Sequence, residues 1–87
     1  MRALIAKLFW WKTEEEVLRD PVRLAAQAMT LGTWDDVLLI RRELGDPLLR
    51  EALRRPPSGV FDARSWHYWH LFFGIDPVPP LPQRELP

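Results

Sequence analysis

Apolar residues recur every three or four positions along most of the chain, and no useful length alternates between apolar and polar side chains. This spacing predicts amphipathic helices rather than strands. A first helix is expected within residues 2–11, where one face would carry Leu4, Ile5, Leu8 and Phe9. The pattern predicts an all-α fold of four or five helices.

Capping residues divide this pattern into segments. Thr13 stands before a run of glutamates, and a threonine N-cap with acids in the first turn is typical of a helix start. Asp20-Pro21 either restarts that helix or ends a short one, since proline suits the first helical position. Gly32 is expected to close the segment.

A tight pair of helices is predicted in the middle of the chain. Thr33 and Asp36 have the spacing of a capping box. Gly45 is a stop signal, and Asp46-Pro47 starts a new helix directly after it. Residues 33–55 therefore predict a helix-turn-helix-like centre.

The segment 61–74 is the most aromatic part of the chain. It holds two of the five tryptophans, the only tyrosine and three of the four phenylalanines. Asp62 is its predicted N-cap, and Trp66, Trp69 and Phe73 fall on one helical stripe. A domain this small cannot bury aromatic rings on every side of one helix. We expect the surplus to contact a partner or a second copy, and Trp10-Trp11 raises the same expectation.

The residues that follow carry too much proline for a helix or an inner strand. Residues 76–87 are predicted to form an extended polyproline II arm beyond a helical domain of residues 1–75. Such an arm loses little entropy on binding, so we expect it to dock in a groove of a partner; a disordered tail is the alternative. Residues 79–84 also fit the P-x-x-P-x-R pattern read by SH3 domains, but that short pattern often arises by chance.

Two sets of residues are assigned from these patterns. The predicted core residues are Trp34, Leu38, Trp66 and Phe73. Tryptophan, tyrosine and arginine are the usual hot spots of protein interfaces. The predicted partner contacts are Trp66, Tyr68, Trp69, His70, Pro80, Leu81 and Arg84.

Composition narrows the class of protein. The length of 87 residues predicts one domain, and a formal net charge of zero weighs against a protein whose main task is to coat nucleic acid. The chain has no cysteine, which excludes disulfides and cysteine-ligated metal. No apolar run reaches the ~20 residues of a spanning helix. We expect a soluble, cytoplasmic protein.

DNA binding is a second functional hypothesis, because arginines gather around the central helices and could face phosphates. These are Arg41, Arg42, Arg50, Arg54 and Arg55. Neighbouring acids dilute their charge, and the second helix lacks the amide and hydroxyl side chains that commonly read bases. A scaffold hairpin with a solvated arginine face is favoured. A self-associating homodimeric module is the third hypothesis.

The sequence gives little support for a catalytic site or a metal site. His67 and His70 have a spacing that can begin a metal site, but no third ligand is apparent. Ser65 lies two residues from His67, and residues two apart on a helix point in different directions. We expect neither a cofactor nor an enzyme.

Four segments in order carry a family resemblance: residues 8–10, 31–36, 60–70 and 79–84. The Trp-Asp-Asp of the second and the Ser-Trp-His-Tyr-Trp-His of the third are its most distinctive parts. This order resembles a family of small bacterial proteins that are often encoded beside nucleotidyltransferase toxins of the AbiEii type.

The resemblance implies that the chain is an antitoxin that neutralises its toxin by direct contact, covering the active-site cleft or the substrate groove. Many antitoxins also carry a clearly basic DNA-binding domain. This chain has none, so we do not expect it to repress transcription alone.

Overall fold

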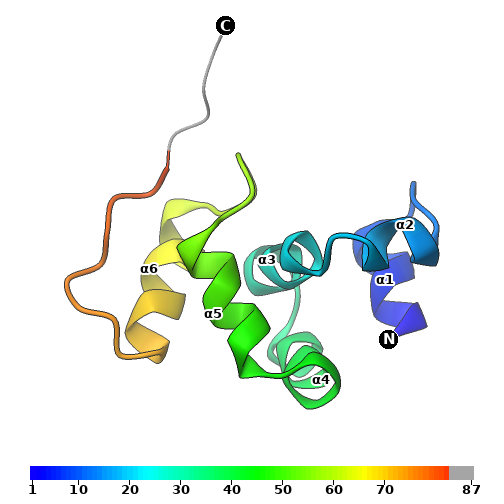
Figure 1. The fold of residues 1–87 in the computed structure, drawn as a ribbon, viewed down its shortest axis with the longest axis horizontal. Helices are drawn as coiled ribbons and strands as arrows, with labels where there is room; N and C mark the ends of the chain where they lie inside the picture. The colour runs from blue at the N-terminus through cyan, green and yellow to red at the C-terminus, as the bar shows by residue number, and fades with distance from the viewer. Residues whose placement is uncertain (83–87) are drawn as a thin grey trace, which may run out of the picture.

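The computed structural model describes residues 1–82, which form six helices and no strand. The helices are α1 (Arg2–Leu8), α2 (Glu14–Leu18), α3 (Pro21–Leu31), α4 (Trp34–Leu44), α5 (Asp46–Arg54) and α6 (Ala63–Phe72) (Figure 1). The all-α prediction is confirmed. None of these helices is long and apolar enough to cross a lipid bilayer.

The predicted number of four or five helices was too small. The difference arises at Asp20-Pro21, which ends α2 and begins α3. A residue before proline is driven out of the helical region, and Asp20 has φ −130° and ψ 73°. Its side chain then accepts a hydrogen bond from the Arg23 amide at 3.2 Å and caps the new helix.

The predicted N-caps are present. The hydroxyl oxygens of Thr13 and Thr33 accept from the amides of Glu16 and Asp36 at 3.1 and 3.2 Å. The carboxylates of Glu16 and Asp36 accept in return from the threonine amides, which completes two capping boxes. Each helix start is therefore set by residues three positions apart.

A left-handed glycine joins α4 and α5. Gly45 has φ +89° and ψ 158°, a region that is essentially restricted to glycine. Its amide donates to the carbonyls of Ile40 and Arg41 at the end of α4. The next helix begins at Asp46, so the two helices meet with almost no loop.

The central helix of the domain is α3, which contacts all five other helices of residues 1–82. It buries Leu24, Ala25, Ala26, Ala28 and Met29. Three alanines on one helix let neighbouring backbones approach closely. Its most extensive partner is α5, which buries Leu49, Ala52 and Leu53.

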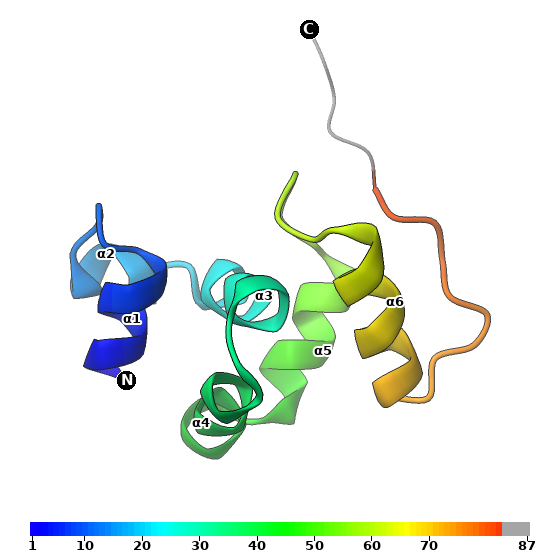
Figure 2. The same ribbon diagram turned by 180° about the vertical axis from the view of Figure 1, so that it is seen from behind.

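The helices around α3 divide the molecule into two ends. Figures 1 and 2 show α1 and α2 at one end and α6 at the other, with α4 at one side of α3. Leu4, Ile5 and Leu8 of α1 are buried. The buried residues of both ends belong to one continuous core.

The C-terminal segment, residues 75–82, contains no helix or strand and runs beside α6 in both views. Its peptide bond between Asp76 and Pro77 is cis. Ile75, Val78 and Leu81 are partly buried and pack against the core. The described part of the predicted arm thus lies on its own chain.

Gly32 is required by the close approach of α3 and α4. Its φ of −81° is open to any residue. A Cβ at this position would instead lie 2.7 Å from the Ala28 carbonyl oxygen and 3.0 Å from an Asp36 carboxylate oxygen. The end of α3 and the N-terminal cap of α4 therefore leave room for the hydrogen atom of glycine but not for a methyl group.

We expect Gly32→Ala to lower the free energy of unfolding by about 1–3 kcal/mol. The added methyl group would push the backbone of α3 away from the N-terminal cap of α4. Urea denaturation followed by circular dichroism measures this change. Leu31→Ala is the control: its side chain is exposed, so its effect should stay within about 0.5 kcal/mol. Equal stabilities for the two variants would contradict the steric argument.

Candidate protein-binding site

The aromatic helix α6 sorts its side chains into a buried side and an exposed side. Trp66, Trp69 and His70 are buried in the chain. Tyr68 and Phe72 are exposed. The surplus of aromatic surface that the sequence predicted is therefore real, and it lies on one side of the helix.

Trp69 ties α6 to the end of α3. Its indole N–H donates to the carbonyl oxygen of Met29 at 2.7 Å. The last carbonyls of a helix have no intrahelical partner, so this bond serves as a C-terminal cap delivered from another helix. The indole ring also stacks on Trp34 of α4, with ring centroids 6.0 Å apart and planes at 11°.

Trp66 and His70 form the other buried contact of α6. The Trp66 indole N–H donates to the carbonyl oxygen of Pro79 at 2.7 Å. The His70 ring lies edge-on at 4.2 Å, and its Nδ1 is 2.7 Å from the Trp66 carbonyl oxygen. A carbonyl oxygen only accepts, so Nδ1 carries the hydrogen. Both polar groups are satisfied within the chain.

We define the aromatic face as Trp34 and Leu38 of α4 together with Tyr68 and Phe72 of α6. Their exposed fractions are 46, 39, 50 and 38%, respectively. The Phe72 ring bridges the two helices, with its centroid 5.6 Å from Trp34 and 6.3 Å from Tyr68. Contiguous exposed apolar surface of this kind makes these residues the candidate site for contact with a partner.

Arg41 closes one end of the aromatic face. Its guanidinium carbon lies 5.5 Å from the Phe72 ring centroid, a cation–π contact. Asp46 holds the guanidinium in a bidentate pair at 2.6 and 3.1 Å. The same hydrogen bonds lower the pKa of the Asp46 carboxyl from its ordinary value. The arginine is thus fixed at the rim before any partner binds.

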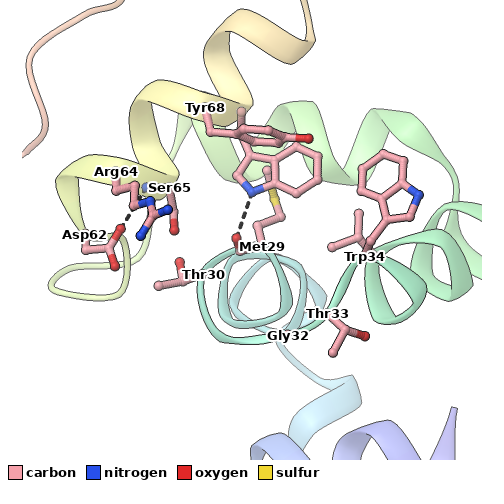
Figure 3. A pocket seen from close by; sticks show the side chains of 11 residues that line it. Met29, Thr30, Gly32, Thr33, Trp34, Asp62, Arg64, Ser65 and Tyr68 are labelled. Carbon is pink, nitrogen blue, oxygen red and sulfur yellow. Dashed lines mark hydrogen bonds between the residues drawn. The ribbon is translucent and has the colours of Figure 1, made fainter.

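A groove of about 420 Å³ lies beside the aromatic face, between the end of α3 and the first turns of α4 and α6. Figure 3 shows Asp62, Arg64 and Ser65 at one end, Trp34 at the other and Tyr68 between them. Met29 and Gly32 also line it. A chain segment lying here would meet aromatic rings at one end and charged groups at the other.

Two carboxylates near this groove serve as helix caps. Asp62 accepts from the Ser65 amide at 2.7 Å, and this bond lowers the pKa of its carboxyl. Asp36 is hydrogen-bonded by the Lys7 ammonium and by the Thr33 amide, and both lower its pKa. Each group favours the ionised form in the folded state.

We expect the domain to lose stability when the pH falls from about 5 to about 3, because a carboxyl with a lowered folded-state pKa stabilises the fold above its unfolded pKa and loses that contribution as it is protonated. Melting temperatures by circular dichroism measure the loss. Asp62→Asn still caps α6 but does not titrate, so its melting temperature should fall less over this range. An unchanged acid dependence would contradict the assignment to Asp62.

The residues predicted to contact a partner are distributed over several environments. Tyr68 and Pro80 are exposed, and Leu81 is partly buried. Trp66, Trp69 and His70 are at most 4% exposed, so in this structure they offer no surface to a partner. Their contact role stays a prediction, and their polar atoms bond within the chain. Arg84 lies outside the described residues.

The predicted core was partly wrong. Trp66 is buried and Phe73 packs partly against the core. Trp34 and Leu38 belong instead to the exposed aromatic face. The pattern of α4 contains the signal that identifies them: the stripe through residues 34 and 38 continues to Arg41, whereas Val37 and Ile40 form the buried stripe.

The five arginines of the DNA hypothesis do not form a free cationic row. Arg54 and Arg55 both lie within 3.6 Å of Glu51, and Arg50 stacks over Phe73 at 4.7 Å. Arg42 is 3.7 Å from Glu43, and Arg41 pairs with Asp46. Asp46 also stands in the first turn of α5, the end that a recognition helix turns toward bases. The local charge disfavours phosphate binding.

The two histidines do not share a site. His67 is exposed, whereas His70 is buried against Trp66. Within residues 1–82, no three side chains of the metal-binding types are grouped so that they could hold an ion.

A second aromatic group lies at the opposite end of the molecule. Trp10 and Trp11 follow α1 in a turn, with rings edge to face at 5.6 Å and exposed fractions of 80 and 56%. This pair is more exposed than the aromatic face is. We use it below as a control surface.

No protein-family model, no curated protein and no solved structure matches this chain.

Proposed function

We propose that this chain is an antitoxin-like protein that binds a nucleotidyltransferase toxin directly and blocks it. The observation that carries the protein-binding part is the aromatic face, where Trp34, Tyr68 and Phe72 stay exposed beside a groove. The family resemblance supplies the identity of the partner.

The composition of the aromatic face suits a binding hot spot. Tryptophan and tyrosine bring large rigid areas at a low cost in side-chain entropy, and such residues dominate interface energies. Trp34 is held by stacking on Trp69, and Arg41 is held by Asp46. A preorganised surface loses less entropy when it binds.

Acidic groups beside the aromatic face suit the kind of partner proposed. Asp35 is exposed next to Trp34, and the exposed Asp62 stands at the polar end of the groove. An enzyme that handles a nucleic acid needs a cationic substrate groove. Carboxylates flanking an aromatic anchor would pair with those cations, so the binding mode would exclude the substrate.

The direct test is co-purification of an affinity-tagged full chain with the product of its adjacent gene, read as the mass and subunit ratio of the complex. We expect a stable complex, and we expect co-expression to rescue growth from the toxin. Absence of both would reject the proposal. Recovery of the tagged chain alone as a dimer would assign the aromatic face to self-association.

A further inference from the structure

The C-terminal segment buries every third residue. Ile75, Val78 and Leu81 are partly buried against the core, whereas the intervening residues and Pro82 are exposed. These three residues lie three positions apart, and Asp76, Pro77, Pro79 and Pro80 between them are exposed. The segment therefore lies on the core along one apolar edge.

The surface beneath this segment offers one polar contact at its centre. The Trp66 indole N–H, which a buried tryptophan must satisfy, donates to the Pro79 carbonyl oxygen at 2.7 Å. Residues 75–82 form no helix or strand, so the Pro79 carbonyl has no partner in regular secondary structure, and prolines carry no N–H that packing would leave unpaired. Phe61 lies edge-on to the Trp66 ring, with ring centroids 5.4 Å apart.

We propose that the surface over Trp66 is a recognition site for extended proline-containing peptides that carry apolar residues at every third position. Residues 75–82 occupy this site as an intramolecular ligand. The partner it fits is a segment of the same chemistry in another protein. This inference does not rest on the proposed toxin, because it concerns a different side of α6.

The connection to α6 allows the segment to leave the site. Gly74 has φ +72°, and a Cβ built on it would meet nothing within 4 Å, so this joint is not enclosed by other groups. A short tether holds its ligand at an effective concentration in the millimolar range. A free peptide of modest affinity therefore cannot displace the segment from the wild-type chain.

The test uses the full chain with Val78→Asp and Leu81→Asp, which removes two of the three buried anchors. A synthetic peptide with the sequence of residues 74–82 is titrated into the variant. The indole N–H resonance of Trp66, assigned with Trp66→Phe, reports occupancy. We expect a saturable shift of that resonance, with the wild-type chain responding at least ten-fold more weakly because of its tethered segment.

The control peptide keeps all the prolines but carries the same two aspartates, so it isolates the three-residue spacing from proline content. We expect it to leave the Trp66 resonance unchanged. If the double variant lacks the native circular dichroism spectrum, the milder variant Val78→Ser replaces it in the titration, and the same shift is expected. The proposal is overturned if a natively folded variant shows no saturable shift up to about 1 mM peptide, or if both peptides bind equally.

Discussion

Replacing Trp69 with alanine is expected to lower the free energy of unfolding by about 3–5 kcal/mol, the range for a large aromatic removed from a core. The side chain is buried, caps Met29 at the end of α3 and supports Trp34 by stacking. A small domain has a total stability on the order of 5–15 kcal/mol, so the variant should be partly unfolded at ordinary temperatures. Urea denaturation of both chains measures the difference.

Trp69→Phe separates the hydrogen bond from the packing. The ring is kept, but the Met29 carbonyl loses the indole N–H that now satisfies it. Leaving a buried acceptor unpaired costs about 1–3 kcal/mol. Trp11→Ala is the matched control, since that tryptophan is mostly exposed and should change stability by less than about 1 kcal/mol. If Trp69→Phe were as stable as the wild type, the capping role of the indole would be wrong.

Tyr68→Ala is expected to weaken the complex with the partner about 30-fold or more, which corresponds to a hot-spot loss of about 2 kcal/mol. The half-exposed ring lies between the groove and Phe72, so a partner covering this surface must bury it. The folded state should be little affected, because the ring is not part of the core. Calorimetric titration with the co-purified partner measures the change.

Trp34→Ala and Trp10→Ala form a matched pair for this prediction. Both tryptophans are substantially exposed, but Trp34 belongs to the aromatic face, whereas Trp10 follows α1, the helix at the end of the molecule away from α6. We expect the first to weaken binding as strongly as Tyr68→Ala and the second to leave it unchanged. The opposite result would move the interface to the N-terminal tryptophans.

Helix boundaries were accessible from local pattern because their causes are local. Thr33 and Asp36 cap one another across three residues, and Asp62 caps the amide of Ser65. Gly45 ends α4 through its own backbone conformation. The remaining ambiguity, Asp20-Pro21, arose because an N-cap with proline can either restart a helix or begin a separate one. The count of helices failed at that single point.

The sorting of the aromatic residues could not be read from spacing. Trp66 and Trp69 lie three positions apart on one stripe of the helix, and an exposed binding stripe would have the same spacing. Trp34 resembles a core residue by residue type alone. Whether a ring is buried in the core depends on which element packs over it. Phe72 stays out beside Tyr68 although it is as apolar as the rings inside.

Sequence alone established the all-α class, the capped helix starts and an excess of aromatic surface, since each depends on composition or on residues within one turn. Tertiary contacts decided where that excess lies. The indole of Trp69 bonds to Met29 forty positions away, and that of Trp66 bonds to Pro79 thirteen positions away. A buried N–H must find an acceptor, and long-range packing determines which acceptor is within reach. Those two bonds turn one side of α6 inward and leave Tyr68 and Phe72 exposed.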